Sequence, residues 1–240
     1  MTTRKRAPRS SGAQGVYPRL RQLIVNSVLA PGSPLIERPL AERLGVSRSS
    51  LRAAIQRLEH EGLVQSTPAG SYSRSIVAPL TVADMEEIYT LKAVLNGAAA
   101  RIAAELPLED RQRIAGEMQA LNDALAQVLA SPSEELDESY DIDDRLHLCY
   151  IAVAGPRLRS IYGAVNTQGE RYGRAYASVM GHAAIIRGPA STSPLEHRRI
   201  IDAILAGDPD RAEREARENW QNAAARLKKV ITSVGERGSF

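Results

Sequence analysis

The sequence predicts a mostly α-helical protein, with an N-terminal winged helix-turn-helix followed by an antiparallel all-α helical bundle. Three observations predict this fold class. The length of 240 residues suits two compact domains. Only 4% of the residues are aromatic, so Leu, Ile, Val and Ala must fill the cores, which favours helix-on-helix packing over a β-sandwich. Apolar residues recur at helical spacing along most of the chain, with one short alternating stretch.

The N-terminal elements come first. Residues 1–15 are polar and basic without periodicity, which predicts a disordered tail. Residues 16–78 form the predicted winged helix. Helices are expected over about 17–29, over about 39–44, and from the cap residue Ser47 to about 61. Residues 63–65, a turn at 67–70 and the alternating residues 72–77 then predict a β-hairpin.

A second domain is predicted over residues 79–232. Pro79 ends the hairpin, and Thr81 with Asp84 resembles a capping box at the start of a helix. Helices are expected at about 82–105, 108–130, 134–153, 156–180, 194–206 and 209–232. An antiparallel bundle follows from this series of helices. Residues 233–240 are expected to be a flexible C-terminus.

Charge is distributed unevenly between the two predicted domains. The whole chain carries a net +3, but residues 1–79 carry +8 and residues 80–240 carry −5. A basic module attracts a polyanion such as DNA and releases its counterions. The single cysteine, Cys149, cannot form an intramolecular disulfide, and no apolar run approaches the length of a membrane span. These features predict a cytoplasmic protein without a membrane partner.

Residues 45–64 (GVSRSSLRAAIQRLEHEGLV) carry the strongest functional signal. Leu51 and Ile55 are spaced to pack against the preceding helices, which leaves Arg48 and Arg52 on the opposite face. A recognition helix needs this pattern, because the residues near its N-terminus enter the major groove. The alternative is that both arginines belong to an ordinary solvated face. The predicted DNA contacts are Arg38, Ser47, Arg48, Ser50, Arg52 and Gly70.

A second set of candidate residues lies in the helical domain. Asp143 and His147 are four residues apart, so a carboxylate and an imidazole share one helical face, as in many divalent metal sites. His197 lies near the start of another predicted helix, and Asn219 lies on the last one. The alternatives are a core histidine, a surface carboxylate and an exposed amide.

The N-terminal motifs resemble those of the GntR family of bacterial regulators, in its FadR-like branch with an FCD domain. The resemblance rests on residues 30–35 (APGSPL), 40–48 (LAERLGVSR), Leu51-Arg52 and 57–63 (RLEHEGL), and it extends over nearly the whole chain. It implies that Arg38, Arg48, Ser50, Arg52 and Gly70 match operator-contacting positions. It also implies a homodimer that binds a short inverted repeat in double-stranded DNA.

The resemblance also implies roles for residues in the helical domain. FCD domains often place an Asp-x-x-x-His pair and two further histidines around a metal, which identifies Asp143, His147 and His197 as ligands. Asn219 stands where the last His is usual, and an amide oxygen is a weaker ligand for zinc-like ions. Lys92 stands where this branch usually has Arg, and a lysine cannot clamp a carboxylate bidentately. The expected site is a divalent metal of the Zn, Ni or Mn type.

The predicted function is a metabolite-responsive DNA-binding regulator, of which a repressor is the commoner kind in the family. Its effector would be a small carboxylate or hydroxy acid, bound by Lys92, Asp143, His147, His197 and Asn219, and without a metal Asn219 would hydrogen-bond the effector directly. Two alternatives stay open on sequence alone. One is a metal-dependent hydrolase or lyase that uses Asp143, His147 and His197. The other is a structural metal or an empty pocket in a domain that serves only dimerisation.

Overall fold

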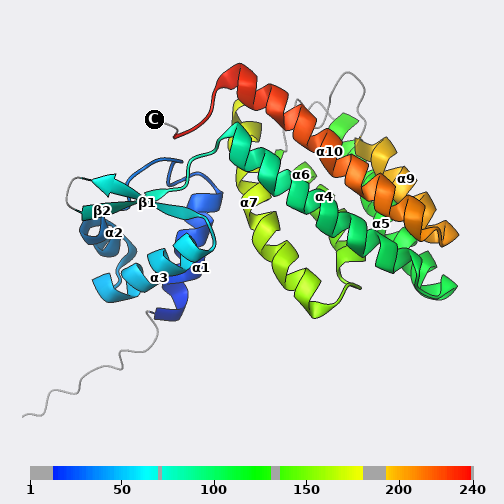
Figure 1. The fold of residues 1–240 in the computed structure, drawn as a ribbon, viewed down its shortest axis with the longest axis horizontal. Coiled ribbons are helices and arrows are strands. Elements are labelled where there is room, and N and C mark those ends of the chain that lie inside the picture. Colours follow the sequence, from blue (N-terminus) through cyan, green and yellow to red (C-terminus); the bar gives the residue numbers. More distant parts are fainter. Residues whose placement is uncertain (1–12, 70–71, 131–135, 181–192, 239–240) are drawn as a thin grey trace, which may run out of the picture. The chain divides into compact units, whose positions relative to one another are not determined.

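A computed structural model describes residues 13–69, 72–130, 136–180 and 193–238 (Figure 1). The chain divides into two compact units, one of residues 1–79 with 237–240 and one of residues 80–236. The predicted basic tail lies mostly outside the described residues, as do Gly70 and residues 181–192.

The first unit contains three helices and one hairpin, which is the arrangement of a winged helix (Figure 1). Its elements are α1 (Ala13–Val25), α2 (Glu37–Leu44), α3 (Arg48–His60), β1 (Val64–Ala69) and β2 (Tyr72–Val77). The strands are antiparallel, with Val64 opposite Val77 and Thr67 opposite Arg74. Leu51, Ile55 and Leu58 are buried from one face of α3 and share a core with residues of α1 and α2. The helical periodicity of α3 thus fixes which face is left for other contacts.

The turn between α2 and α3 has a clear local cause. Gly45 ends α2 with a left-handed φ of 67°, a conformation that a residue without a Cβ adopts at little cost. Ser47 then caps α3, because its hydroxyl oxygen accepts a hydrogen bond from the Ser50 amide at 3.1 Å. These two residues set the entry of α3 and so the placement of its first turn, which carries Arg48.

Three predicted boundaries of this unit are wrong. The first helix begins at Ala13 instead of about residue 17, so residues 13–15 are helical and not part of a tail. It ends at Val25 instead of about residue 29, because Ser27 has a φ of 56° and the Leu29 amide donates to the Leu23 carbonyl at 2.9 Å. The expected turn at 67–70 is also too wide, since β1 stays paired with β2 as far as Ala69.

The second unit is an all-α bundle, as predicted. Its helices are α4 (Val82–Ala104), α5 (Leu108–Ala130), α6 (Leu136–Ile151), α7 (Pro156–Met180), α9 (Ser193–Ala206) and α10 (Pro209–Val234). Helix α10 packs along α4, and α5 packs against α6 and α9 (Figure 1). Small side chains such as Ala99, Ala103 and Ala216 are fully buried where these helices meet. Such residues let helix axes approach closely, which suits a core with few aromatic rings.

Contacts at the two ends of the bundle could not be predicted from the helical periodicity of the sequence. Arg101 pairs with Asp210 at 2.6 Å and with Glu213 at 3.2 Å, which joins the end of α4 to the start of α10. The expected flexible C-terminus is too long, because α10 continues to Val234 and Glu236 accepts a hydrogen bond from the Val82 amide at 2.7 Å. Within the described residues, every helix is too short or too polar to cross a membrane.

Candidate functional site

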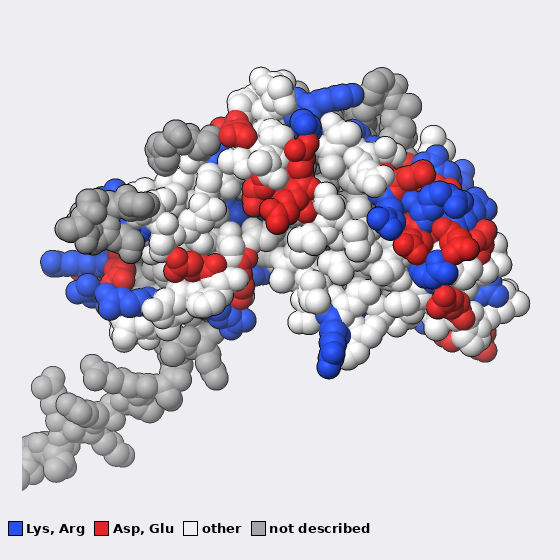
Figure 2. Space-filling view, in the orientation of Figure 1, with Lys and Arg blue, Asp and Glu red and all other residues white. Residues whose placement is uncertain are grey.

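The first candidate surface is the exposed face of α3. The Arg48 and Arg52 side chains keep 65% and 58% of their surface exposed, and the Arg38 side chain on α2 is also exposed. Figure 2 shows Lys and Arg side chains gathered over the region of α2 and α3, with a few acidic groups beside them. The structure therefore leaves these three guanidinium groups at the surface, where the recognition-helix hypothesis requires them.

One carboxylate on α2 holds both arginines of α3. Glu37 Oε1 accepts from Arg52 Nε at 2.8 Å and Glu37 Oε2 accepts from Arg52 Nη2 at 2.7 Å. Arg48 Nη2 lies 3.5 Å from Glu37 Oε2. The hydrogen bonds from Arg52 hold the pKa of Glu37 below its usual range. Sequence reasoning missed Glu37, although its place beside Arg38 at the start of α2 was the available signal.

The remaining predicted DNA contacts divide into two groups. Ser47 and Ser50 lie at the start of α3, where their hydroxyl oxygens are 2.7 Å apart and Ser47 also caps the helix. Arg38 pairs with Glu42 one turn along α2, at 3.3 Å. Gly70 lies outside the described residues. The structure thus brings the described members together on one face of the unit, around the turn between α2 and α3.

The second candidate site lies inside the helical unit, where α6 and α9 meet. His197 Nε2 is 3.5 Å from Asp143 Oδ1, and His147 Nε2 is 3.9 Å from Asp143 Oδ2. One ligand atom from each of the three residues lies within 4.8 Å of the others. Both histidines are fully buried and the Asp143 side chain keeps 22% of its surface exposed. These separations leave room for a cation about 2 Å from each atom.

Neighbouring side chains set the tautomer of His147. Asn96 donates through Nδ2 to the Lys92 carbonyl at 2.8 Å, which leaves its Oδ1 to accept from the Tyr150 hydroxyl at 2.7 Å. The Tyr150 oxygen lies 2.6 Å from His147 Nδ1. Because the hydroxyl proton is given to Asn96, the oxygen must accept from His147 Nδ1–H. The lone pair of His147 is therefore on Nε2, the nitrogen that faces Asp143.

His197 is oriented in the same way. Asn122 donates through Nδ2 to the Pro194 carbonyl at 3.0 Å, and its Oδ1 lies 3.2 Å from His197 Nδ1. Nδ1 is then the protonated nitrogen, and the buried Nε2 has no hydrogen-bond partner among the described residues. Two imidazole lone pairs and a carboxylate thus converge, and no donor from the described part of the chain lies between them. A divalent cation fits this donor set. Metal-binding histidines usually donate their other ring N–H to a neighbouring acceptor, as Nδ1 of His147 and of His197 do here.

Burial shifts the pKa values of this cluster. It raises the pKa of Asp143 to about 7 and lowers the pKa of His197 to about 4. Burial also lowers the pKa of His147 well below its usual range. All three shifts disfavour the charged forms, as expected where protein atoms replace water. Neutral imidazoles are the form that binds a metal, and a cation would in turn favour the ionised form of Asp143.

The buried Asn219 side chain is held by Glu196. Its Nδ2 donates to the buried Glu196 Oε2 at 2.9 Å, so only Oδ1 of its side chain can serve a cation. Glu196 also accepts from Asn222 and from Arg226, both at 3.0 Å. Burial opposes ionisation of Glu196, but the hydrogen bond and charge of Arg226 hold its pKa below the usual range.

A cavity of about 50 Å³ adjoins the Asp143 side of the cluster. Polar and aromatic groups line it, including Asp143, Asp144, Lys92, Arg226, Tyr140 and Trp220. The buried Lys92 donates to Asn166 Oδ1 at 2.7 Å, and its Nζ lies 3.7 Å from the centre of the Trp220 ring. Burial lowers the pKa of Lys92 to about 8. The cavity therefore places two basic side chains beside a metal-type donor set.

Sequence reasoning missed several residues of this pocket. Arg226 follows Asn219 by two helical turns on α10, so the common face was a usable signal. Tyr150 follows His147 by one turn of α6 in the same way. Asn122 on α5 gave no such signal, because its role depends on a contact with α9.

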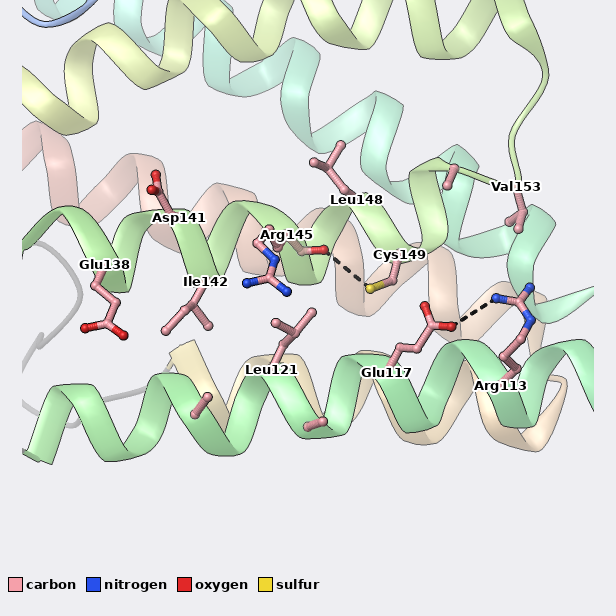
Figure 3. Close-up of a pocket in the computed structure, with 13 residues that line it drawn as sticks. Arg113, Glu117, Leu121, Glu138, Asp141, Ile142, Arg145, Leu148, Cys149 and Val153 are labelled. Atoms are coloured by element: carbon pink, nitrogen blue, oxygen red, sulfur yellow. Dashed lines mark hydrogen bonds and ion pairs between the residues drawn. The ribbon is translucent and has the colours of Figure 1, made fainter.

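A wider hollow lies elsewhere on the helical unit, between α5 and α6. Its volume is about 1420 Å³, and Figure 3 shows the side chains of Leu121, Ile142, Leu148 and Val153 along it. Arg113 and Glu117, 3.2 Å apart, lie toward one end, and Glu138 and Asp141 lie toward the other (Figure 3). This hollow uses the face of α6 that does not carry Asp143 and His147.

Comparison with known proteins agrees with this two-part architecture. Residues 13–72 match the family described as "Bacterial regulatory proteins, gntR family", and residues 87–222 match the FCD domain. The Escherichia coli protein "HTH-type transcriptional repressor RspR" is 25% identical over 90% of this chain and 89% of its own length. A Streptomyces ambofaciens HTH-type transcriptional regulator, itself uncharacterized, is 31% identical over 80% of this chain and 75% of its own length.

Solved structures show the same fold. A GntR regulator from Rhodococcus sp. RHA1 superposes with a TM-score of 0.66 at 22% identity, covering 90% of this chain and 96% of that one. E. coli McbR/YncC gives a TM-score of 0.62 at 19% identity, covering 90% and 97%. The matched families are regulators and not enzymes, which decides against the hydrolase or lyase alternative. The chain belongs to the GntR family of transcription regulators, DNA-binding proteins in which the winged helix is joined here to an FCD domain.

Proposed function

We propose that the protein is a metabolite-responsive repressor that binds a divalent cation and a small carboxylate or hydroxy acid in its FCD domain. The observation that carries the proposal is the convergence of lone pairs from Asp143, His147 and His197 beside a cavity that Lys92 and Arg226 line together with Asp143 and Asp144. Two imidazole nitrogens and one carboxylate suit a cation of the Zn, Ni or Mn type. Three protein ligands leave coordination positions for an effector.

Volume supports a small effector, and charge supports an anionic one once a bound cation offsets the Asp143 and Asp144 carboxylates. Lys92 and Arg226 line the cavity, and an anion that enters beside a cation would be held by both. At roughly 10–15 Å³ for each water-sized group, the cavity of about 50 Å³ holds only a few atoms. A carboxylate or hydroxy acid of a few carbons is therefore the preferred class. Lys92, Asp143, His147, His197 and Asn219 are its proposed contacts.

The proposed response is a change in operator affinity. Arg38, Ser47, Arg48, Ser50, Arg52 and Gly70 are the proposed DNA contacts. The protein would act as a homodimer whose two winged helices engage the half-sites of an inverted repeat. Lys92 lies on α4, which begins at Val82 shortly after β2 ends at Val77. An effector that shifts α4 would act on the winged helix through this short connection, and repression would weaken as the effector binds.

Metal analysis of the full-length protein tests the cation directly. The purified protein is dialysed against each of Zn²⁺, Ni²⁺ and Mn²⁺, and bound metal is measured by mass spectrometry. We expect about one ion per chain for the preferred metal, and loss of that ion in His197→Ala. A matched control is His60→Ala, because His60 is an exposed histidine at the end of α3. Equal metal content in all three proteins would contradict the proposal.

A second experiment tests the effector. Thermal melting of the metal-loaded protein is followed with a panel of small carboxylates and hydroxy acids, since a ligand that binds only the folded state raises the melting temperature. Acids that raise it should also weaken binding to a DNA duplex that the protein enriches from a random pool. An acid that stabilises the protein but leaves its DNA affinity unchanged would contradict the proposed coupling between the FCD domain and the winged helix.

A further inference from the structure

The Glu37 carboxylate occupies one edge of the Arg52 guanidinium. Its two oxygens accept from Nε at 2.8 Å and from Nη2 at 2.7 Å, which is the side-on bidentate geometry. The same carboxylate lies 3.5 Å from Arg48 Nη2. Glu37 is the first residue of α2, so a separate helix fixes where the two side chains of α3 point.

This geometry leaves a second fork on Arg52. A guanidinium has five N–H donors, and Glu37 takes the one on Nε and one of the two on Nη2. The two hydrogens of Nη1 and the other hydrogen of Nη2 have no partner among the residues that the structure describes. Together they form the end-on pair that matches the O6 and N7 acceptors of guanine in the major groove. The Arg52 side chain stays 58% exposed, so this end remains open to a partner.

Two physical effects follow from the presence of Glu37. An arginine side chain has many rotamers, and holding it before DNA arrives reduces the conformational entropy lost on binding. A carboxylate beside the fork also repels phosphate, so it weakens contacts that carry no sequence information. The first effect favours the correct base and the second disfavours non-specific DNA.

We propose that Glu37 is a positioning residue that sets base specificity, by holding Arg52 so that its end-on fork reads guanine while its side edge is closed to phosphate. This inference rests on the proposed DNA contact of Arg52. It differs from an inhibitory role, in which Glu37 would only compete with DNA for the arginines. The two roles are separable, because loss of a positioning residue lowers specificity, whereas loss of a competitor tightens binding to every sequence and leaves specificity unchanged.

The experiment compares two duplexes. The first is a duplex that the wild-type protein enriches from a random-sequence pool, and the second is a scrambled duplex of the same length and composition. Affinities of wild type, Glu37→Gln and Glu37→Ala are measured by fluorescence anisotropy at several salt concentrations. Glu59→Ala is the matched control, because Glu59 lies on α3 and accepts from the Ser66 hydroxyl instead of from an arginine. Thermal melting checks that each variant is folded.

For Glu37→Ala we expect tighter binding to the scrambled duplex and weaker binding to the enriched one, with the ratio falling about tenfold. When each guanine of the enriched duplex is replaced in turn by adenine, the difference in affinity between wild type and Glu37→Ala should concentrate at one guanine per half-site. Glu37→Gln should lie between wild type and Glu37→Ala, because one amide oxygen still accepts from Arg52. Glu59→Ala should tighten both duplexes alike.

Three results would overturn parts of this reasoning in distinguishable ways. If Glu37→Ala tightens both duplexes by the same factor, Glu37 is a competitor and the positioning role is wrong. If neither affinity changes in a folded Glu37→Ala variant, Glu37 has no role in DNA binding and the inference fails, while the regulator function stands. If the wild-type protein enriches no sequence at all, both the inference and the proposed DNA contacts fail.

Discussion

The buried amine of Lys92 allows a quantitative prediction. Burial lowers the pKa of Lys92 from 10.5 to about 8, so the folded protein disfavours its charged form. One pKa unit corresponds to about 1.4 kcal/mol, which makes the ammonium a cost of roughly 3 kcal/mol to the folded state near pH 7. Replacing Lys92 by Met keeps an unbranched side chain, one heavy atom shorter, and removes the charge. It also leaves Asn166 without its donor, which costs about 1 kcal/mol.

We therefore expect Lys92→Met to be more stable than wild type by about 2 kcal/mol at pH 7. The sign follows from linkage. A lysine whose folded pKa is depressed destabilises the protein fully below the folded pKa of about 8, and this cost shrinks as the pH rises toward 10.5. At about pH 9.5 the cost falls to roughly 1.4 kcal/mol, so the advantage of the variant should nearly disappear.

The assay is urea unfolding of both proteins at pH 7 and pH 9.5, with a chelator present so that no bound cation adds to the local charge. Lys228→Met is the matched control. Lys228 is half exposed and pairs with Glu86 at 2.6 Å, so its loss should change stability by less than about 1 kcal/mol. A Lys92→Met protein that is less stable than wild type at pH 7 would mean that the buried ammonium does not destabilise the folded state. Small carboxylates should no longer stabilise Lys92→Met, because the variant lacks a proposed contact of the effector. That result would mean that the wild-type protein keeps Lys92 for binding although it lowers the stability of the fold.

Three further predictions concern single residues. Asp143→Ala should lower bound metal from about one ion per chain to near zero by mass spectrometry, because it removes the ligand that both histidines face; an unchanged content would place the ion elsewhere. Arg52→Ala should weaken binding to the enriched duplex by about 1–3 kcal/mol in anisotropy titrations and relax preference at one base pair; a uniform loss on all sequences would make Arg52 a phosphate contact. Ser47→Ala removes the cap of α3 and should cost about 1 kcal/mol in urea unfolding, whereas Ser47→Gly should cost only a few tenths; equal losses would mean that the hydroxyl does not act as a cap.

Much of the architecture was predictable because it depends on local signals. Gly45 and Ser47 mark the turn before α3, and Asp208-Pro209 marks the start of α10. The errors fell at the ends of elements, where contacts compete with periodicity. The apolar spacing continued to residue 29, but the chain leaves the helix after Val25 because Ser27 takes a left-handed conformation.

The candidate sites were predictable only in part. Asp143 and His147 share a face of α6 by spacing alone, and Arg48 and Arg52 share a face of α3 for the same reason. The ligand role of His197 was implied by the resemblance, and Arg226, Tyr150 and Asn122 were not predicted. Arg226 and Tyr150 share helical faces with Asn219 and His147, but Asn122 contacts His197 from a different helix, where periodicity carries no information.

Local patterns in the chain were enough to predict the winged helix, the helical second domain and the two arginines that face outward, because helix periodicity and caps act over a few residues. The contact of Glu37 on α2 with Arg52 on α3, and that of His197 Nε2 with Asp143, became visible only in the folded protein. Such pairs depend on how one helix packs against another. That packing is fixed by the whole core, and no short stretch of the chain encodes it.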